Sequence, residues 1–364
     1  MNASVTKLPI QEEAASSDAA RREVRYEYSD NLVPILGQLG TSLILSTYQA
    51  GKLVVVGVHE DELKISFHNF ERAMGVAVGR NQIAVGGKDW IYFLKSAPEL
   101  ASRVGVQDTH DACFLVRGAH YTGEIAVHEL VWGQEQLVVT NTRFSCLCAL
   151  DNNSSFVPQW RPPFVSALAP EDRCHLNGIA LVDGQPRYAT VLGQADTAGG
   201  WRPGKSTDGC VLEILTGKVV ANGFAMPHSP RVSHGRLWVL NSGMGELTTV
   251  NLSSGLVESV IELPGYPRGL ALAGRFAFVG LSQAREKDTF GNLPICDRNT
   301  SPKCGLAIID LQTATQVGLL EFQSGVDEIF DVQLLPGIQN PYFSGPYAAT
   351  DGNPPIWKVP APSR

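Results

Sequence analysis

Apolar and polar residues alternate along most of the chain, in short runs that are separated by glycine-containing turns. One phrase recurs: an apolar strand, a short turn and a second strand. Its copies are MGVAVGRNQIAVGG, HELVWGQEQLVVTN, NGIALVDGQPRYATV, PRVSHGRLWVLNS, RGLALAGRFAFVG and a looser one that begins with FDVQLLPG. A period of two residues is typical of β-strands, whereas the 3.6-residue period of an amphipathic helix is nearly absent. The pattern therefore predicts an all-β protein.

Each phrase is followed by a second hairpin, so the repeating unit contains four strands. GELTTVNLSSGLVESVIEL and CGLAIIDLQTATQVGLLEF are two of these hairpins. Four-stranded units that recur about every 40 to 50 residues are the signature of a β-propeller. The N-terminal strands TSLILST, KLVVVGVH and ELKISFHNF lack an inner strand. Either the two chain ends share one blade or each end builds its own, so we predict six or seven blades and favour seven.

Composition limits the classes of function. We expect a disordered polar tail over residues 1–30 and one propeller over residues 31–360. The 364 residues include 36 glycines and 22 prolines, which suits short strands and tight turns. A net charge of −7 without a basic cluster excludes a nucleic-acid partner. The sequence contains neither a membrane-length apolar run nor a signal peptide, so we expect no membrane partner. Seven irregularly spaced cysteines indicate reduced thiols and a cytoplasmic location; the oligomeric state stays open.

The loops divide into two kinds. In a propeller, the loops that enter the inner strands emerge on the same face as those that join second and third strands. Here these loops are long and polar, as in RGAHYTGEIAVHE, FVSALAPEDRCHLN, GFAMPHSPR and SGVDEIFD, whereas the other turns are minimal. Functional residues are concentrated on loops that a rigid scaffold positions. We therefore expect the functional site on the long-loop face, at the mouth of the central channel.

Three histidines stand where inner strands begin. When the six phrases are aligned on Val76, Leu130, Ile179, Val232, Leu270 and Val332, His175 and His228 lie four residues before the aligned position, and His128 lies two residues before it. Imidazole is a common ligand of copper, iron and zinc, and three histidines leave coordination positions open for water or substrate. We therefore predict a transition metal (copper, iron or zinc) held by these three side chains. The alternative is that they only hydrogen-bond one another and channel waters.

Acidic, basic and aromatic residues accompany the histidines. Asp172, Glu129 and Asp331 are candidate catalytic groups that act as a base or orient a ligand. The candidates for substrate binding are Arg173, Arg231, Arg268, Trp201 and Asn177. An arginine captures an acid group with two hydrogen bonds, and the glycine-rich loop around Trp201 would close over a ligand. The alternatives are that the arginines pair with nearby acids and that Trp201 packs against a neighbouring blade.

Long motifs along the repeat region indicate a relationship. STYQAGKL, EDRCHLNGIAL, ADTAGGWR, MPHSPR, RLWVLNSGMGEL, GLSQARE and EIFDVQLLPG lie between Leu36 and Pro341. Together they resemble an uncharacterised bacterial β-propeller family of conserved hypothetical proteins. The resemblance implies the propeller fold and a bacterial, cytoplasmic setting, and it brings no settled activity. The matching motif positions are Asp172, Arg173, His175, Asn177, Trp201, His228, Arg231, Glu286 and Asp331.

Two functions follow from these residues. The first is a metal-dependent enzyme, an oxidoreductase or a hydrolase, that acts on a small or peptidic substrate, as in the tailoring of specialised metabolites. The alternative is a non-catalytic propeller that binds a peptide, a glycan or a protein partner through the same face. That function requires aromatic anchors in the loops, and candidates are Phe70, Tyr121, Phe164, Trp201, Tyr266 and Phe290.

Overall fold

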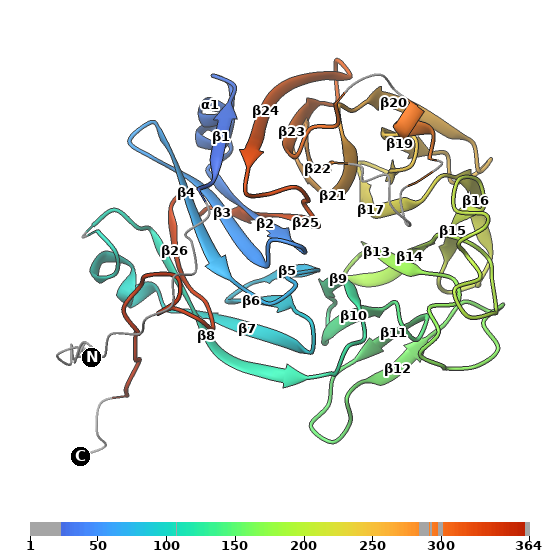
Figure 1. The fold of residues 1–364 in the computed structure, drawn as a ribbon, viewed down its shortest axis with the longest axis horizontal. Coiled ribbons are helices and arrows are strands. Elements are labelled where there is room, and N and C mark those ends of the chain that lie inside the picture. Colours follow the sequence, from blue (N-terminus) through green and yellow to red (C-terminus); the bar gives the residue numbers. More distant parts are fainter. Residues whose placement is uncertain (1–22, 107, 284–290, 292, 298–300, 361–364) are drawn as a thin grey trace.

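Six sheets surround a central channel (Figure 1). The computed structural model describes residues 23–106, 108–283, 291, 293–297 and 301–360. In ring order, the channel-lining strands are β5 (Val76–Gly79), β9 (Val127–Trp132), β13 (Leu176–Val182), β17 (Pro227–Ser233), β21 (Tyr266–Ala273) and β25 (Asp331–Pro336). The all-β propeller fold is confirmed, and the number of blades is six.

Three further strands complete each blade outward from the channel. These strands are β2 (Thr41–Thr47), β3 (Lys52–His59), β4 (Glu62–Asn69), β6 (Gln82–Gly86), β7 (Trp90–Ser96), β8 (Ala112–Tyr121), β10 (Leu137–Asn141), β11 (Cys146–Ala149), β12 (Val157–Trp160), β14 (Gln185–Val191), β15 (Gly209–Glu213), β16 (Val219–Phe224), β18 (Arg236–Asn241), β19 (Glu246–Val250), β20 (Val257–Glu262), β22 (Phe276–Ser282), β23 (Gly305–Asp310) and β24 (Thr315–Ser324). Middle strands such as β3, KLVVVGVH, are almost wholly buried. They read as continuous apolar runs because both of their faces pack against neighbouring blades.

The chain ends share one blade, which is why the preference for seven blades was wrong. β25 comes from the C-terminal part of the chain and pairs with β2, with Leu45 opposite Val332. The Gly337 amide donates to the Gly40 carbonyl at 2.8 Å, which continues this pairing. β25 thereby supplies the inner strand that the N-terminal strands lack. The later segments YAAT and IWKV form turn or irregular structure.

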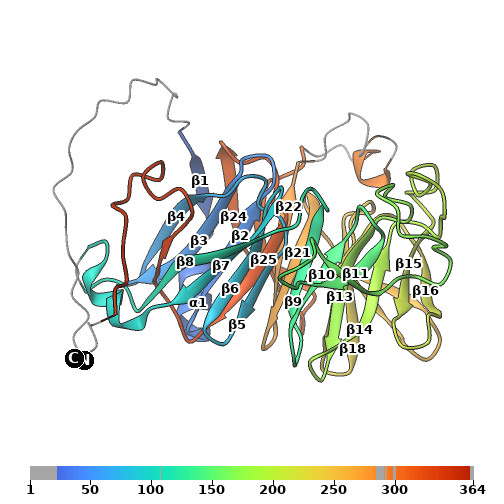
Figure 2. The same ribbon diagram turned by 90° about the horizontal axis from the view of Figure 1, so that it is seen from below.

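The remaining elements extend the outer rim. β1 (Arg25–Tyr28) adds a fifth strand beside β24, and β26 (Pro341–Ser344) pairs in parallel with β8. The helix α1 (Leu32–Leu39) and the 3₁₀ helices η1 (Pro98–Arg103) and η2 (Pro294–Asp297) complete the structure. β1 lies within the range expected as a polar tail, residues 1–30, and residues 1–22 lie outside the described part. In Figure 2, η2 (orange) lies on the upper side of the disc.

Glycines and charged residues alternate around the channel. The position before the aligned apolar residue is occupied in turn by Gly75, Glu129, Gly178, Arg231, Gly269 and Asp331. Each charged side chain bonds the backbone just after the next glycine: Glu129 accepts from the Ile179 amide at 2.7 Å, Arg231 donates to the Leu270 carbonyl at 2.8 Å, and Asp331 accepts from the Val76 amide at 2.8 Å. Arg231 also forms an ion pair with Glu129. These side chains tie neighbouring blades together.

Candidate functional site

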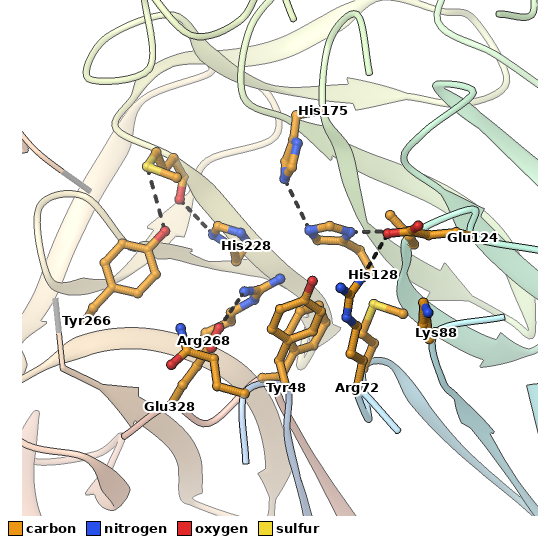
Figure 3. A pocket seen from close by; sticks show the side chains of 15 residues that line it. Tyr48, Arg72, Lys88, Glu124, His128, His175, His228, Tyr266, Arg268 and Glu328 are labelled. Atoms are coloured by element: carbon orange, nitrogen blue, oxygen red, sulfur yellow. Dashed lines mark hydrogen bonds and ion pairs between the residues drawn. The ribbon is translucent and has the colours of Figure 1, made fainter. Parts of the chain in front are cut away.

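A cavity of about 270 Å³ opens at the mouth of the channel (Figure 3). Every blade contributes the residue that lies four positions before its aligned apolar residue. These residues are Arg72, Ala126, His175, His228, Tyr266 and Glu328. The other lining residues are Tyr48, Gln49, Met74, Lys88, Glu124, His128, Met226, Arg268 and Phe330. The prediction that the strand entrances meet at the channel mouth is confirmed.

Three of the six residues that lie four positions before the aligned residue have a left-handed backbone conformation. The φ angles of Arg72, Ala126 and His175 are 50°, 54° and 51°. A non-glycine residue in this region costs on the order of 1 kcal/mol, and such residues cluster at functional sites. At His175 the turn directs the imidazole into the cavity (Figure 3).

His128 and His175 meet ring to ring in the cavity wall. Their Nε2 atoms are 3.1 Å apart, and their ring centroids are 4.6 Å apart with an angle of 83° between the planes. A collinear N–H···N hydrogen bond would separate the centroids by the nitrogen distance plus two ring radii, roughly 5.4 Å. The two rings are therefore not collinear: they meet nearly at right angles, with their Nε2 atoms at the contact.

The Nδ1 atoms of this pair are held by acceptors. His175 Nδ1 lies 2.9 Å from Asp172 Oδ2. His128 Nδ1 lies 2.8 Å from Thr142 Oγ1, and that hydroxyl donates its own proton to the Leu176 carbonyl at 2.5 Å. Both Nδ1 atoms must therefore carry hydrogen, which leaves the two Nε2 atoms to face each other without a second hydrogen-bond partner among the described residues. At 3.1 Å this arrangement requires a proton or a metal cation between them.

His228 repeats the same arrangement across the cavity. Its Nδ1 lies 2.9 Å from the Met226 carbonyl and 3.0 Å from Ser242 Oγ, which itself donates to the Pro267 carbonyl at 2.7 Å. Nδ1 is again the protonated nitrogen, so Nε2 carries a lone pair. His228 is set apart from the His128–His175 pair in Figure 3. Accordingly, no three His, Cys, Asp or Glu side chains of the described chain are already grouped as metal ligands.

Burial keeps two of these imidazoles neutral. It lowers the pKa of His128 well below its usual range, and the neighbouring His175 lowers that pKa further. Burial likewise lowers the pKa of His228, with the positive charge of Arg268 as the next cause. A neutral imidazole binds a metal, whereas an imidazolium does not.

Trp201 supports Asp172 instead of covering a ligand. Its Nε1–H donates to Asp172 Oδ2 at 3.0 Å, and its ring centroid lies 4.5 Å from that of His175. The Trp201 side chain is buried and is not part of the cavity wall. The guanidinium of Arg202 lies over the outer side of the indole, 4.7 Å from its centroid. The predicted lid is therefore a fixed wall behind the His175–Asp172 pair.

Of the candidate arginines, only Arg268 lines the cavity. Its guanidinium carbon lies 3.4 Å from the centroid of the Phe330 ring, and its Nη1 lies 3.3 Å from Glu328 Oε1. Burial lowers the pKa of Arg268, opposed by the charge of Glu328. Arg173 bonds Glu171 and Asp196 at 2.8 Å each, away from the cavity, and Arg231 lies in the channel. Arg173 and Arg231 thus pair with acidic side chains, which is the alternative to substrate binding given above.

The other candidate residues have structural partners. Asn177 donates to the Pro227 carbonyl at 2.9 Å and accepts from Thr190 at 2.6 Å. Glu129 and Asp331 border a cavity of about 10 Å³ beneath the main one. Burial raises the pKa of both, that of Glu129 to about 7, against the opposing charge of Arg231. Glu129 and Asp331 each bond a backbone amide of another blade, so they hold blades together. Glu286 lies outside the described residues.

The sequence reasoning missed the hydroxyl groups that support the histidines. In four blades a serine or threonine lies within one residue of the end of the second strand and donates to a carbonyl of the next blade. The residues are Ser46, Thr142, Ser242 and Ser282. Two of them also hold the Nδ1 atoms of His128 and His228. The recurrence of LST, TNT, LNS and GLS at the ends of the second strands is a signal that would have found them.

Comparisons with known proteins locate the chain in a family. None of the curated proteins searched matches it. One similar solved structure is titled "Crystal structure of Nidogen/Laminin Complex"; it has a TM-score of 0.48 and 9% identity, and the match covers 82% of this chain and 98% of that chain. Within the described residues, no helix has the length and apolar character needed to cross a membrane. A family model described as "Domain of unknown function (DUF4915)" matches residues 30–343. The chain therefore belongs to the DUF4915 family.

Proposed function

We propose that this protein is a metal-dependent enzyme whose transition metal is bound by Nε2 of His128 and of His175 at the channel mouth. The observation that supports this proposal is the pair of facing Nε2 atoms, 3.1 Å apart, with both Nδ1–H groups held by acceptors. Two ligands at about 2.0–2.1 Å from one tetrahedral zinc ion are separated by roughly 3.3 Å. The pair therefore fits a shared metal with little movement of either ring.

The surroundings match those of metal-binding histidines in general. Such histidines usually donate their second ring nitrogen to a carboxylate, a hydroxyl or a carbonyl, which fixes the tautomer and orients the ring. Asp172 does this for His175, and Thr142 does it for His128. His228 is the third residue of the proposed site: its Nδ1 bonds the Met226 carbonyl, and its Nε2 makes no hydrogen bond within the described part of the chain. It would hold the metal as a third ligand or accept a hydrogen bond from water at the site.

The proposed reaction class is hydrolysis or oxidation of a small or peptidic substrate. A metal with two or three protein ligands keeps positions open for water and substrate, and it can polarise a carbonyl or activate water. The cavity volume of about 270 Å³ suits a small molecule or one side chain of a peptide. As part of the same proposal we expect a cytoplasmic location in a bacterium, as the sequence resemblance implies. The absence of disulfides among the seven cysteines of the described chain supports a reducing compartment.

The experiment is elemental analysis of protein that is purified without a metal-affinity column. We expect about one equivalent of copper, iron or zinc per chain, and its loss in His128→Ala and His175→Ala proteins that keep the β-sheet circular dichroism of the parent. His234→Ala is the matched control, because His234 is exposed and bonds only Ser233 among the described residues. Metal-loaded parent and variants are then compared for oxygen uptake and for hydrolysis of small esters and amides.

Two results would contradict the proposal. One is no bound metal in the parent, even after reconstitution with each ion. The other is metal that persists in both histidine variants. In either case the His128–His175 pair shares a proton, and a propeller that binds a peptide, a glycan or a protein becomes the better account.

A further inference from the structure

Arg268 is a buried cation with few partners. Its side chain is 10% exposed, and among the described residues its only hydrogen bond joins Nη1 to Glu328 Oε1, at 3.3 Å. A guanidinium has five N–H donors. Arg231, one inner strand away, bonds the Leu270 carbonyl, the Pro230 carbonyl and Glu129. The two arginines therefore differ in that the donors of Arg268 are largely unused by the protein.

The unused donors of Arg268 face the cavity. Arg268 is a lining residue, and in Figure 3 its guanidinium lies among the side chains of His228, Tyr48 and Glu328. Phe330 lies flat against the guanidinium, at 3.4 Å, and fixes its plane. A buried guanidinium held in this way costs free energy unless its donors are satisfied by a ligand or by water.

We propose that Arg268 binds the carboxylate of a small carboxylic acid, the substrate of the proposed metal site, on which this inference rests. The planar fork of a guanidinium matches a carboxylate with two parallel hydrogen bonds. A phosphate fits less well, because the other lining cations lie at the rim: Arg72 pairs with Glu124, and Lys88 lies near Glu71 and Asp89.

The same geometry places the carboxylate next to the metal site. The Phe330 ring contacts both the Arg268 guanidinium and the His128 imidazole, whose ring centroid is 5.3 Å from that of Phe330. Tyr48 stacks on Phe330 at 5.8 Å. An acid group on Arg268 would therefore leave the rest of a small molecule beside the His128–His175 pair, along a wall made of aromatic rings and of Met74 and Met226.

The test measures carboxylate binding to metal-free protein by saturation-transfer NMR and calorimetry. The probes are acetate and benzoate, with acetamide and benzamide as uncharged controls of the same shape. We expect at least one carboxylate to bind and its amide to bind at least about 10-fold more weakly. Because no metal is present, the result is independent of whether the metal proposal holds.

Two variants assign the binding to Arg268. The double variant Arg268→Gln/Glu328→Gln removes both charges of the pair, so neither is left buried alone, and Arg268→Lys keeps the charge but loses the fork. Both should weaken carboxylate binding about 10-fold or more, whereas Arg72→Gln at the rim should not. The inference is overturned if neither carboxylate binds, if the amides bind equally well, if inorganic phosphate binds more tightly than both acids, or if the Arg268 variants bind like the parent.

Discussion

At the scale of single residues, the channel depends on glycines as much as on charges. A Cβ at Gly75 would lie 2.8 Å from Glu129 Cα and 3.0 Å from the His128 carbonyl oxygen. The inner strands can approach this closely only because every second blade has no side chain at that position. The charged side chains then extend into the space that the glycines leave, and the strand that carries His128 is held against its neighbour.

Replacing Gly75 by alanine should therefore destabilise the protein. The added methyl group meets rigid backbone, so we expect a loss of about 1–3 kcal/mol in the free energy of unfolding, measured in urea. Gly118→Ala in β8 is the control: no atom lies within 4 Å of its added Cβ, and the change should stay within about 0.5 kcal/mol. Equal effects of the two substitutions would show that the close approach at Gly75 does not matter.

His68 is expected to make stability depend on pH. Burial, assisted by the charge of Lys52, lowers the pKa of this imidazole to about 4. In the unfolded chain it titrates near 6.5, so protonation favours unfolding, and stability falls as the pH drops through 6.5 toward 4. Between pH 7.5 and pH 5 the parent should lose about 2 kcal/mol more than His68→Gln. Urea unfolding of both proteins at the two pH values measures this; identical pH slopes would contradict it.

At the scale of elements, the strands could be predicted from the sequence, whereas the roles of the loops could be predicted only in part. Val54 to Val56 and their counterparts in other blades form apolar runs that only a buried strand explains. The loop entrances were located by alignment, and all six residues four positions before the aligned residue do meet in one cavity. The direction of each side chain could not be predicted. The left-handed turn at His175 and the burial of Trp201 depend on contacts between loops that are distant in sequence.

The loop between β14 and β15 should tune the metal site through Trp201. Trp201→Phe keeps an aromatic ring against His175 but removes the Nε1–H that holds Asp172. We expect the affinity for metal to fall by about 10- to 100-fold, measured by competition with a chelator. Trp238→Phe is the control, because Trp238 is also buried and its Nε1 has no hydrogen-bond partner within the described structure. An unchanged affinity in Trp201→Phe would remove the role assigned to this hydrogen bond.

At the scale of the whole molecule, closure of the ring depends on a strand from the far end of the chain. The sequence left six and seven blades open, because it did not show that β25 would pair with β2. The Asp331 contact with the Val76 amide links this closing blade to the next one. Ring closure therefore also completes the cavity. Phe330 and Glu328 precede β25 in the closing blade, and Arg72 and Met74 precede β5 in the next blade.

A chain that ends at Ser324 should fail to fold cooperatively. It lacks β25, so β2 would be left without a partner on its channel side. The hydrogen bond from the Val76 amide to Asp331 would also be missing. We expect a broad thermal transition or insoluble protein. A chain that ends at Ser344 retains β25 and β26 and should unfold in a single sharp transition. A sharp transition in the shorter chain would mean that ring closure is not required.

The most direct test of the central claim is a crystal structure of metal-loaded protein, with diffraction recorded on both sides of the absorption edge of the bound metal. The proposed site predicts one anomalous peak about 2.0–2.1 Å from Nε2 of both His128 and His175. A pair that remains hydrogen-bonded without a peak between its nitrogens, or a metal bound elsewhere on the protein, would contradict it.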